Sequence, residues 1–324
     1  MLRIFLFLAT NIAIMIVISL IFSVLGLNST LDAQGVNLDL NALLIMSAII
    51  GMTGSFISLA LSKWSAKRAM GVQIIEGPQD ATEQWLMDIV AQQARSVGID
   101  MPDVGIFQST DANAFATGMT KNSSLVAVST GLLNSMSQDE VEAVIGHEIS
   151  HVANGDMVTM ALMQGVVNTF VYFFATIIGH TVDRVIFRNE EGHGIAYYIT
   201  QILAQIALSF LASILVAWFS RYREFKADAG GASLAGNAKM ISALRALQRN
   251  HEPENLPGQL AAFGINGASV QKLFMSHPPL EERIAALTTG IAEQVHEQQR
   301  WTVEHITNAQ AGIQQQMTDM MEKS

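Results

Sequence analysis

Four long apolar segments limit what this chain of 324 residues can fold into. They cover residues 2–27, 42–61, 157–179 and 195–219, and Arg3 is the only charged residue within them. An apolar helix of about 20 residues spans a hydrocarbon core of about 30 Å. The first segment is longer than the apolar core of a secretory signal peptide, so we interpret it as a retained anchor. The sequence therefore predicts a mainly helical integral membrane protein with four transmembrane helices.

The composition agrees with a membrane protein and narrows the possible ligands. Half of the residues are hydrophobic and 14% are charged, whereas soluble domains have about 25% charged residues. The formal net charge of −10 argues against nucleic acid as a partner, because phosphate binding needs clustered lysine and arginine. Since the chain has no cysteine, a bound metal would need histidine and carboxylate ligands.

Lysine and arginine near the apolar segments predict the orientation of the chain. They are Arg3, Lys63, Lys67, Arg68, Arg221, Arg223 and Lys226. The loop over 28–41 has no lysine or arginine, and the loop over 180–194 has charges of both signs. Both termini and both polar blocks, 62–156 and 220–324, are therefore expected in the cytoplasm. The two blocks must fold together, because the hairpin over 157–219 returns the chain to the side from which it started.

Small and amide side chains within the segments indicate how the helices pack. Gly51 allows a neighbouring helix to approach closely. Amides recur at helical spacing in the last two segments, Gln164 with Asn168 and Gln201 with Gln205. Such amides either form hydrogen bonds between helices or line a polar path for a substrate, and we favour the hydrogen bonds. These two segments could also form a buried hairpin that does not cross the bilayer.

The first polar block is predicted to combine helices with a small sheet, which gives the α+β class. Residues 81–97 form an amphipathic helical pattern that Gly98 would end. Residues 104–107 and 125–129 are short β-like runs, and the small, uncharged stretch over 113–118 suits another strand.

A His-Glu-Ile-Ser-His sequence on a predicted helix indicates metal chemistry. Ser137 and Glu140 form a capping box, so a helix should begin there and run through His151. His147 and His151 share one helix face, where both imidazoles can bind one metal, and Glu148 can address a water there. Two histidines and a carboxylate suit a catalytic zinc with an open position. The alternative is a pair of surface histidines that bind no metal.

Glu224 is the candidate for the third metal ligand. It follows the fourth apolar segment as closely as His151 precedes the third, so adjacent antiparallel helices would bring the two residues together. Asp228 lies one helical turn after Glu224 and suits a carboxylate that accepts a hydrogen bond from a ligand imidazole. The alternative for both acids is a juxtamembrane charge cluster. Asp156 is a rival ligand, but it is five residues from His151 and off the expected metal-binding face.

Five sequence stretches resemble those of the HtpX family, the membrane-bound heat-shock metalloproteases of bacteria. The stretches are 113–118, 126–133, 147–156, 223–229 and 277–279. The resemblance covers about the first 290 residues and extends to the larger gluzincin group, which includes the CAAX prenyl proteases. It implies a gluzincin-like metallopeptidase domain with one Zn²⁺ per chain on His147, His151 and Glu224, and Glu148 as the general base. It also implies a location in the bacterial inner membrane and a role in degrading misfolded or damaged membrane proteins and unfolded polypeptides.

Two further roles are assigned within these stretches. His277 is the first candidate to stabilise the oxyanion of the transition state, and Tyr222 and Arg283 are the next candidates. It could instead be a residue at the start of a helix. An edge strand is expected to pair with the substrate backbone, although an interior strand or loop is the alternative. The residues of that strand are Asn113, Ala114, Phe115 and Ala116.

Other function classes fit the sequence less well. An intramembrane protease would need its metal in the bilayer, whereas the helix before His147 is acidic and polar. A CAAX-type processing protease remains an alternative within the same fold. A transporter should carry ionisable residues inside its spans, whereas these segments contain amides and no charged residue other than Arg3. A non-catalytic zinc-binding scaffold would keep the metal without cleavage.

The chain ends in a polar, glutamine-rich extension over 291–324. We expect it to be a surface helix or partly disordered, because its apolar stripe is thin. Its methionines could contact lipid or another copy of the chain, so self-association is possible. The expected parts are two N-terminal helices, a first domain part, the membrane hairpin, a second domain part and the extension. These parts cover 1–61, 62–156, 157–219, 220–290 and 291–324.

Overall fold

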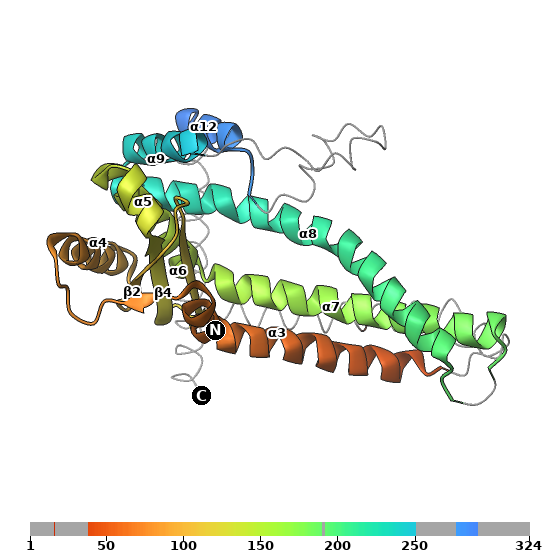
Figure 1. Ribbon diagram of the computed structural model, residues 1–324. Coiled ribbons are helices and arrows are strands. Elements are labelled where there is room, and N and C mark those ends of the chain that lie inside the picture. Colours follow the sequence, from red (N-terminus) through yellow and green to blue (C-terminus); the bar gives the residue numbers. More distant parts are fainter. Residues whose placement is uncertain (1–15, 17–37, 190–191, 251–276, 291–324) are drawn as a thin grey trace, which may run out of the picture.

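A computed structural model describes Ile16 and residues 38–189, 192–250 and 277–290. The described part is mainly helical and contains one small sheet. Three long helices extend to one side of a group of shorter helices and strands (Figure 1). The predicted span over 2–27 and the polar extension over 291–324 lie outside the described residues, apart from Ile16.

The three long helices are each long and apolar enough to cross a membrane. They are α3 (Leu40–Met70), α7 (Asp156–Thr181), which continues as the π-helix η1 (Val182–Ile186), and α8 (Ile195–Ala235). Only 6% of the most apolar window of α8 is buried. Such a long exposed apolar surface is stable in lipid rather than in water. The chain is therefore a multi-pass membrane protein, with three candidate membrane helices among the described residues.

Gly51 and Gln201 have the expected packing roles in these helices, whereas Gln164 and Asn168 do not bond between helices. A Cβ atom at Gly51 would lie 2.6 Å from the backbone nitrogen of Thr169, so α3 and α7 approach closely there. Gln201 donates a hydrogen bond to Thr176 across the α7–α8 interface, at 3.0 Å. Gln164 instead bonds Asn168 within α7, and both line a cavity of about 270 Å³ between α7 and α8. The amides thus serve both interhelical bonding and a polar lining.

A four-stranded sheet lies beside the membrane helices, in the strand order β1-β2-β4-β3. The strands are β1 (Gln73–Ile74), β2 (Asp103–Phe107), β3 (Ala114–Thr120) and β4 (Ser123–Ser129). β2 and β4 are parallel, and β3 runs antiparallel to β4 at one end of the sheet. The predicted strands and the predicted helix over 81–97 are confirmed, and the helix is α4 (Ala81–Val97), which ends at Gly98.

One hydrophobic core joins the two polar blocks of the chain. The helices around it are α5 (Thr130–Ser135), α6 (Gln138–Asn154), α9 (Asn237–Asn250) and α12 (Leu280–Thr288). Leu86 and Ile145 from the first block share this core with Leu244 and Leu287 from the second block. Burial of large apolar side chains from both blocks drives them to fold as one unit.

The long helices α7 and α8 connect this core directly to the membrane segments. α8 is continuous over 41 residues, about 60 Å, so the helix has no break where the fourth apolar segment ends. α6 and α7 are separated only by Gly155, which has a φ of 67°. Gly231 lets α8 approach α6, because a Cβ atom there would lie 2.9 Å from the backbone nitrogen of His147. This close approach positions the site described next.

Candidate metal centre

α6 presents its two histidines on one buried face. The helix begins with the predicted capping box, in which Ser137 and Glu140 bond each other's backbone N–H groups. The Nε2 atoms of His147 and His151 are 3.1 Å apart, one helical turn along α6. Glu148 lies between them in the sequence and is half-buried. The spacing of the motif therefore brings the Nε2 atoms of two imidazole rings close to one point.

α8 supplies a carboxylate to the same point. Glu224 is 2% exposed, and its oxygens lie 3.4 Å from His147 Nε2 and 3.3 Å from His151 Nε2. One ligand atom from each of the three residues lies within 4.8 Å of the others. The structure thus brings together the three side chains expected to bind the metal, although Glu224 lies 73 positions after His151 in the sequence.

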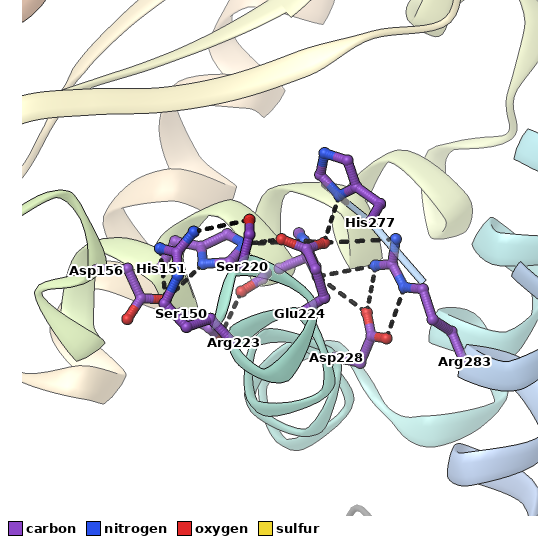
Figure 2. A network of polar contacts seen from close by, with 11 residues as sticks. Ser150, His151, Asp156, Ser220, Arg223, Glu224, Asp228, His277 and Arg283 are labelled. Atoms are coloured by element: carbon purple, nitrogen blue, oxygen red, sulfur yellow. Dashed lines mark hydrogen bonds and ion pairs between the residues drawn. The ribbon is translucent and has the colours of Figure 1, made fainter. Parts of the chain in front are cut away.

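Asp228 and Arg283 support His147 from behind. Asp228 lies one turn after Glu224 on α8, and its Oδ1 is 3.0 Å from His147 Nδ1. Arg283, on α12, donates two hydrogen bonds to the Asp228 carboxylate, at 2.8 and 2.5 Å. Figure 2 shows Asp228 and Arg283 in one network of polar contacts with Glu224. A bidentate arginine fixes the carboxylate that orients the imidazole.

Asp156 supports His151 in the same way, and it lies outside the group of three candidate ligands, as expected. Its Oδ2 is 2.6 Å from His151 Nδ1. The sequence did not predict its contact with His151, because α6 ends at Asn154 and Gly155 separates it from α7. Asp156 therefore begins a new helix and reaches back to the ring. Arg223, from α8, lies 3.6 Å from the same carboxylate oxygen (Figure 2).

These contacts leave the metal-facing nitrogens of both rings available. When Asp228 and Asp156 accept hydrogen bonds at Nδ1, each neutral imidazole keeps a lone pair on Nε2. Both lone pairs then lie beside the Glu224 carboxylate. Two neutral imidazole nitrogens and one carboxylate oxygen form a donor set that suits a transition metal ion. The residues therefore fit the metal that the motif implies.

Without a metal, the same contacts favour protons on the two histidines. Burial lowers the pKa of His151, but its hydrogen bonds with Asp156 and Glu224 outweigh this effect and raise the pKa to about 10. Burial likewise lowers the pKa of His147, and hydrogen bonds with Asp228 and Glu224 raise it above its ordinary value. A metal ion must displace these protons, because only the neutral ring is a ligand.

The three oxyanion candidates have different surroundings. His277 is 62% exposed at its side chain, and its Nδ1 is 2.7 Å from Glu224 Oε2. Arg283 is buried and committed to Asp228, although its Nη1 lies 3.6 Å from Glu224. Tyr222 is 53% exposed, with the ammonium group of Lys226 4.7 Å from its ring centroid. Of the three, His277 combines contact with the site and access to solvent.

The candidate substrate strand is the terminal strand of the sheet. Asn113 precedes β3, and its carbonyl accepts a hydrogen bond from the backbone of Ser129, at 2.8 Å. Because hydrogen-bonding directions alternate along an antiparallel strand, Phe115 also faces β4, and Ala114 and Ala116 direct their N–H and C=O groups outward. Within the described ranges, no strand pairs with this outer edge.

Two arginines of the network have contacts that the sequence did not predict. Arg223 and Arg283 were expected near the membrane surface and near the oxyanion, respectively, yet each lies against a carboxylate that holds a histidine. The sequence contains only a weak signal for these contacts. Asp228 lies one helical turn after Glu224, and Asp156 lies five residues after His151, so both acids are close in sequence to candidate ligands.

The fold and the site together define a membrane-embedded metallopeptidase. Two histidines one turn apart on α6 and a glutamate from α8 form a group that is compatible with a metal site, and long apolar helices adjoin it. Residues 80–291 match the model of peptidase family M48, and the chain belongs to this family.

Similar proteins agree with this assignment. The Protease HtpX of Thioalkalivibrio sulfidiphilus is 64% identical over 288 residues, which are 88% of this chain and 98% of that relative. The Protease HtpX homolog of Nitrosomonas eutropha is 59% identical over 290 residues, which are 89% of this chain and 99% of that relative. These relatives confirm the resemblance to HtpX.

A solved structure shares the fold at lower identity. Ste24p of S. mikatae matches with a TM-score of 0.57 and 19% sequence identity. The match covers 83% of this chain and 66% of Ste24p, so it spans slightly less than two thirds of that protein.

Proposed function

We propose that the chain is a zinc-dependent endopeptidase that holds one Zn²⁺ on His147, His151 and Glu224. The observation that carries this proposal is the convergence of these three side chains within 4.8 Å. Two carboxylates that hold the Nδ1 atoms of the histidines support it further, since such contacts orient imidazole ligands.

Glu148 is the proposed general base. When bound at such a site, zinc supplies Lewis-acid chemistry that polarises a peptide carbonyl and makes a nearby water more acidic. Glu148 takes a proton from the attacking water and delivers it to the leaving amine. Its charge acts on both His151 and Arg283, which supports a position beside the metal ligands.

His277 is the proposed donor to the developing oxyanion. Its ring contacts Glu224, and it is open to solvent, so a substrate can reach it. A preorganised donor at this point stabilises negative charge that develops in the transition state. In this role His277 would act on the substrate rather than on the fold.

The outer edge of β3 is proposed to bind the substrate as an added strand. Ala114 and Ala116 offer outward backbone groups, and Asn113 and Phe115 hold the strand against β4. Backbone pairing recognises an extended polypeptide with little regard to sequence. This suits the proposed substrates, which are unfolded polypeptides and misfolded or damaged membrane proteins.

The site is proposed to act at the cytoplasmic face of the bacterial inner membrane. The lysine and arginine distribution supports a topology with four spans, including 2–27, and with both termini in the cytoplasm. The cavity between α7 and α8 reaches Ser220, one turn before Glu224, which supports access from the bilayer. The names of the relatives, Protease HtpX, support proteolysis as the activity.

Zinc content and casein cleavage, measured on the same purified samples, test the proposal. The wild-type chain should contain one zinc and cleave casein. Glu148→Gln should keep the zinc and lose cleavage, whereas Glu224→Ala should lose both. Asp139→Ala, at an acid with a 70% exposed side chain on the same helix, should behave as wild type. Cleavage by Glu148→Gln would contradict the assigned base, and zinc without cleavage in the wild type would favour a scaffold.

A further inference from the structure

A second pair of histidines lies at the end of the α7–α8 hairpin that is remote from the metal centre. His180 is in the last turn of α7, and His193 lies two residues before α8 begins. The Nδ1 atom of His180 is 3.3 Å from the Nε2 atom of His193. α7 has 26 residues, so its length of about 39 Å separates this pair from the metal centre.

The spacing of the pair matches that of two ligands on one ion. Two nitrogens that are each about 2.05 Å from a tetrahedral zinc lie about 3.3 Å apart. The pair at the metal centre is similarly spaced, at 3.1 Å. A direct N–H···N hydrogen bond between the two rings fits the same distance, so a measurement of zinc binding must distinguish the two interpretations.

A buried carboxylate beside the pair favours a cation. Asp183, in η1, is 1% exposed, and its Oδ2 accepts hydrogen bonds from Asn189 and from the backbone of Gly194. Its Oδ1 is buried and meets no hydrogen-bond donor in good geometry among residues 38–189, 192–250 and 277–290, although the backbone N–H of Tyr197 lies near the carboxylate. The charges of Arg184 and Asp183 act on His180 with opposite signs, and the Asp183 charge also interacts with His193. A buried carboxylate is unfavourable unless it is hydrogen-bonded and near a positive charge.

The surrounding structure holds both rings in place. His180 is 6% exposed, so its ring is fixed by packing. His193 is exposed, and its ring lies against that of Tyr197, with the centroids 4.0 Å apart. η1 is a π-helix, an element that often occurs at functional sites. One buried and one exposed imidazole leave the remaining coordination positions open to water.

We propose that His180 and His193 form a second transition-metal site at this end of the hairpin. Imidazole ligands select Zn²⁺, Cu²⁺ or Ni²⁺ over Mg²⁺ and Ca²⁺, which prefer oxygen ligands. The ion joins the end of α7 to the segment that leads into α8. With two protein ligands rather than three, this site binds zinc more weakly than the metal centre.

Zinc binding by the full chain, with the metal centre removed, tests this site separately from the proposed peptidase activity. In a His147→Ala/His151→Ala background, equilibrium dialysis against zinc alone should still find one zinc per chain. Adding His193→Asn should lower that zinc affinity at least tenfold. His305→Asn, a substitution of a histidine in the C-terminal extension, is the matched control and should change nothing.

Folding is checked by circular dichroism and by a single peak in size-exclusion chromatography. His193 is the better test position because its side chain is exposed, and His180→Asn should produce the same loss in any sample that folds. Absence of zinc binding in the background would overturn the proposal. Binding that survives His193→Asn, or that is lost with His305→Asn, would overturn it as well.

Discussion

Removal of the Asp156 carboxylate tests how the site holds its metal. The Asp156 side chain is 10% exposed, and its Oδ2 lies 2.6 Å from His151 Nδ1. In Asp156→Ala, the His151 ring loses the partner that directs its Nε2 atom toward Glu224. The half-buried Arg223 guanidinium also loses its carboxylate neighbour. Loss of such a supporting contact typically weakens metal affinity about 10- to 100-fold, which corresponds to about 1.4–2.8 kcal/mol.

Competition with a zinc chelator measures this effect. Asp156→Asn keeps an oxygen that can accept the hydrogen bond but loses the charge, so its affinity should fall between those of wild type and Asp156→Ala. Glu224→Ala removes a ligand and should weaken binding more than Asp156→Ala. Wild-type affinity in Asp156→Ala would refute the supporting role. A loss as large as that of Glu224→Ala would instead make Asp156 a ligand.

Three other predictions address protons, the base and the substrate strand. Zinc affinity should rise with pH below about 10, by about tenfold per unit for each proton released, because the pKa of His151 is raised to about 10 and that of His147 is also raised. Calorimetry in buffers of different ionisation enthalpy counts these protons, and no proton release would contradict the prediction. During purification with zinc, the wild-type chain should cut itself, and a chelator or Glu148→Gln should protect it. Equal fragmentation in Glu148→Gln on a gel would indicate a contaminating protease. Ala116→Pro removes an outward N–H group and should lower kcat/KM for a peptide about 2- to 12-fold, the effect of one hydrogen bond. Ala116→Gly keeps this donor and is the control, so equal kcat/KM values for the two variants would argue against strand addition.

Local signals predicted the elements that carry the site. The capping box of Ser137 and Glu140 marks the start of α6, and Gly98 marks the end of α4. The spacing of His147 and His151 predicts a shared helix face without knowledge of the fold. These predictions depend on residues within one or two helical turns of each other, where backbone geometry leaves few alternatives.

The contacts between distant segments could not be predicted in the same way. Arg283 reaches Asp228 across 55 residues, and no local pattern indicates that pair. The contact of Asp156 with His151 was not predicted, because one glycine decides whether the helix continues or restarts before Asp156. Gly155 has a φ of 67°, a conformation that ends α6 and lets α7 begin in a new direction. A helical projection through that glycine therefore fails.

The metal centre depends on how α6 and α8 cross, and the membrane helices help to set that crossing. α8 carries Glu224 and Asp228 on the same continuous helix that packs against α7 through the bond between Gln201 and Thr176. A shift of α8 by one turn, about 5.4 Å, would move Glu224 out of reach of both histidines. Gly231 permits the close approach, and the interhelical bond restrains α8 along its axis. The packing of α8 against α7 in the bilayer therefore helps to determine where Glu224 lies relative to the two histidines.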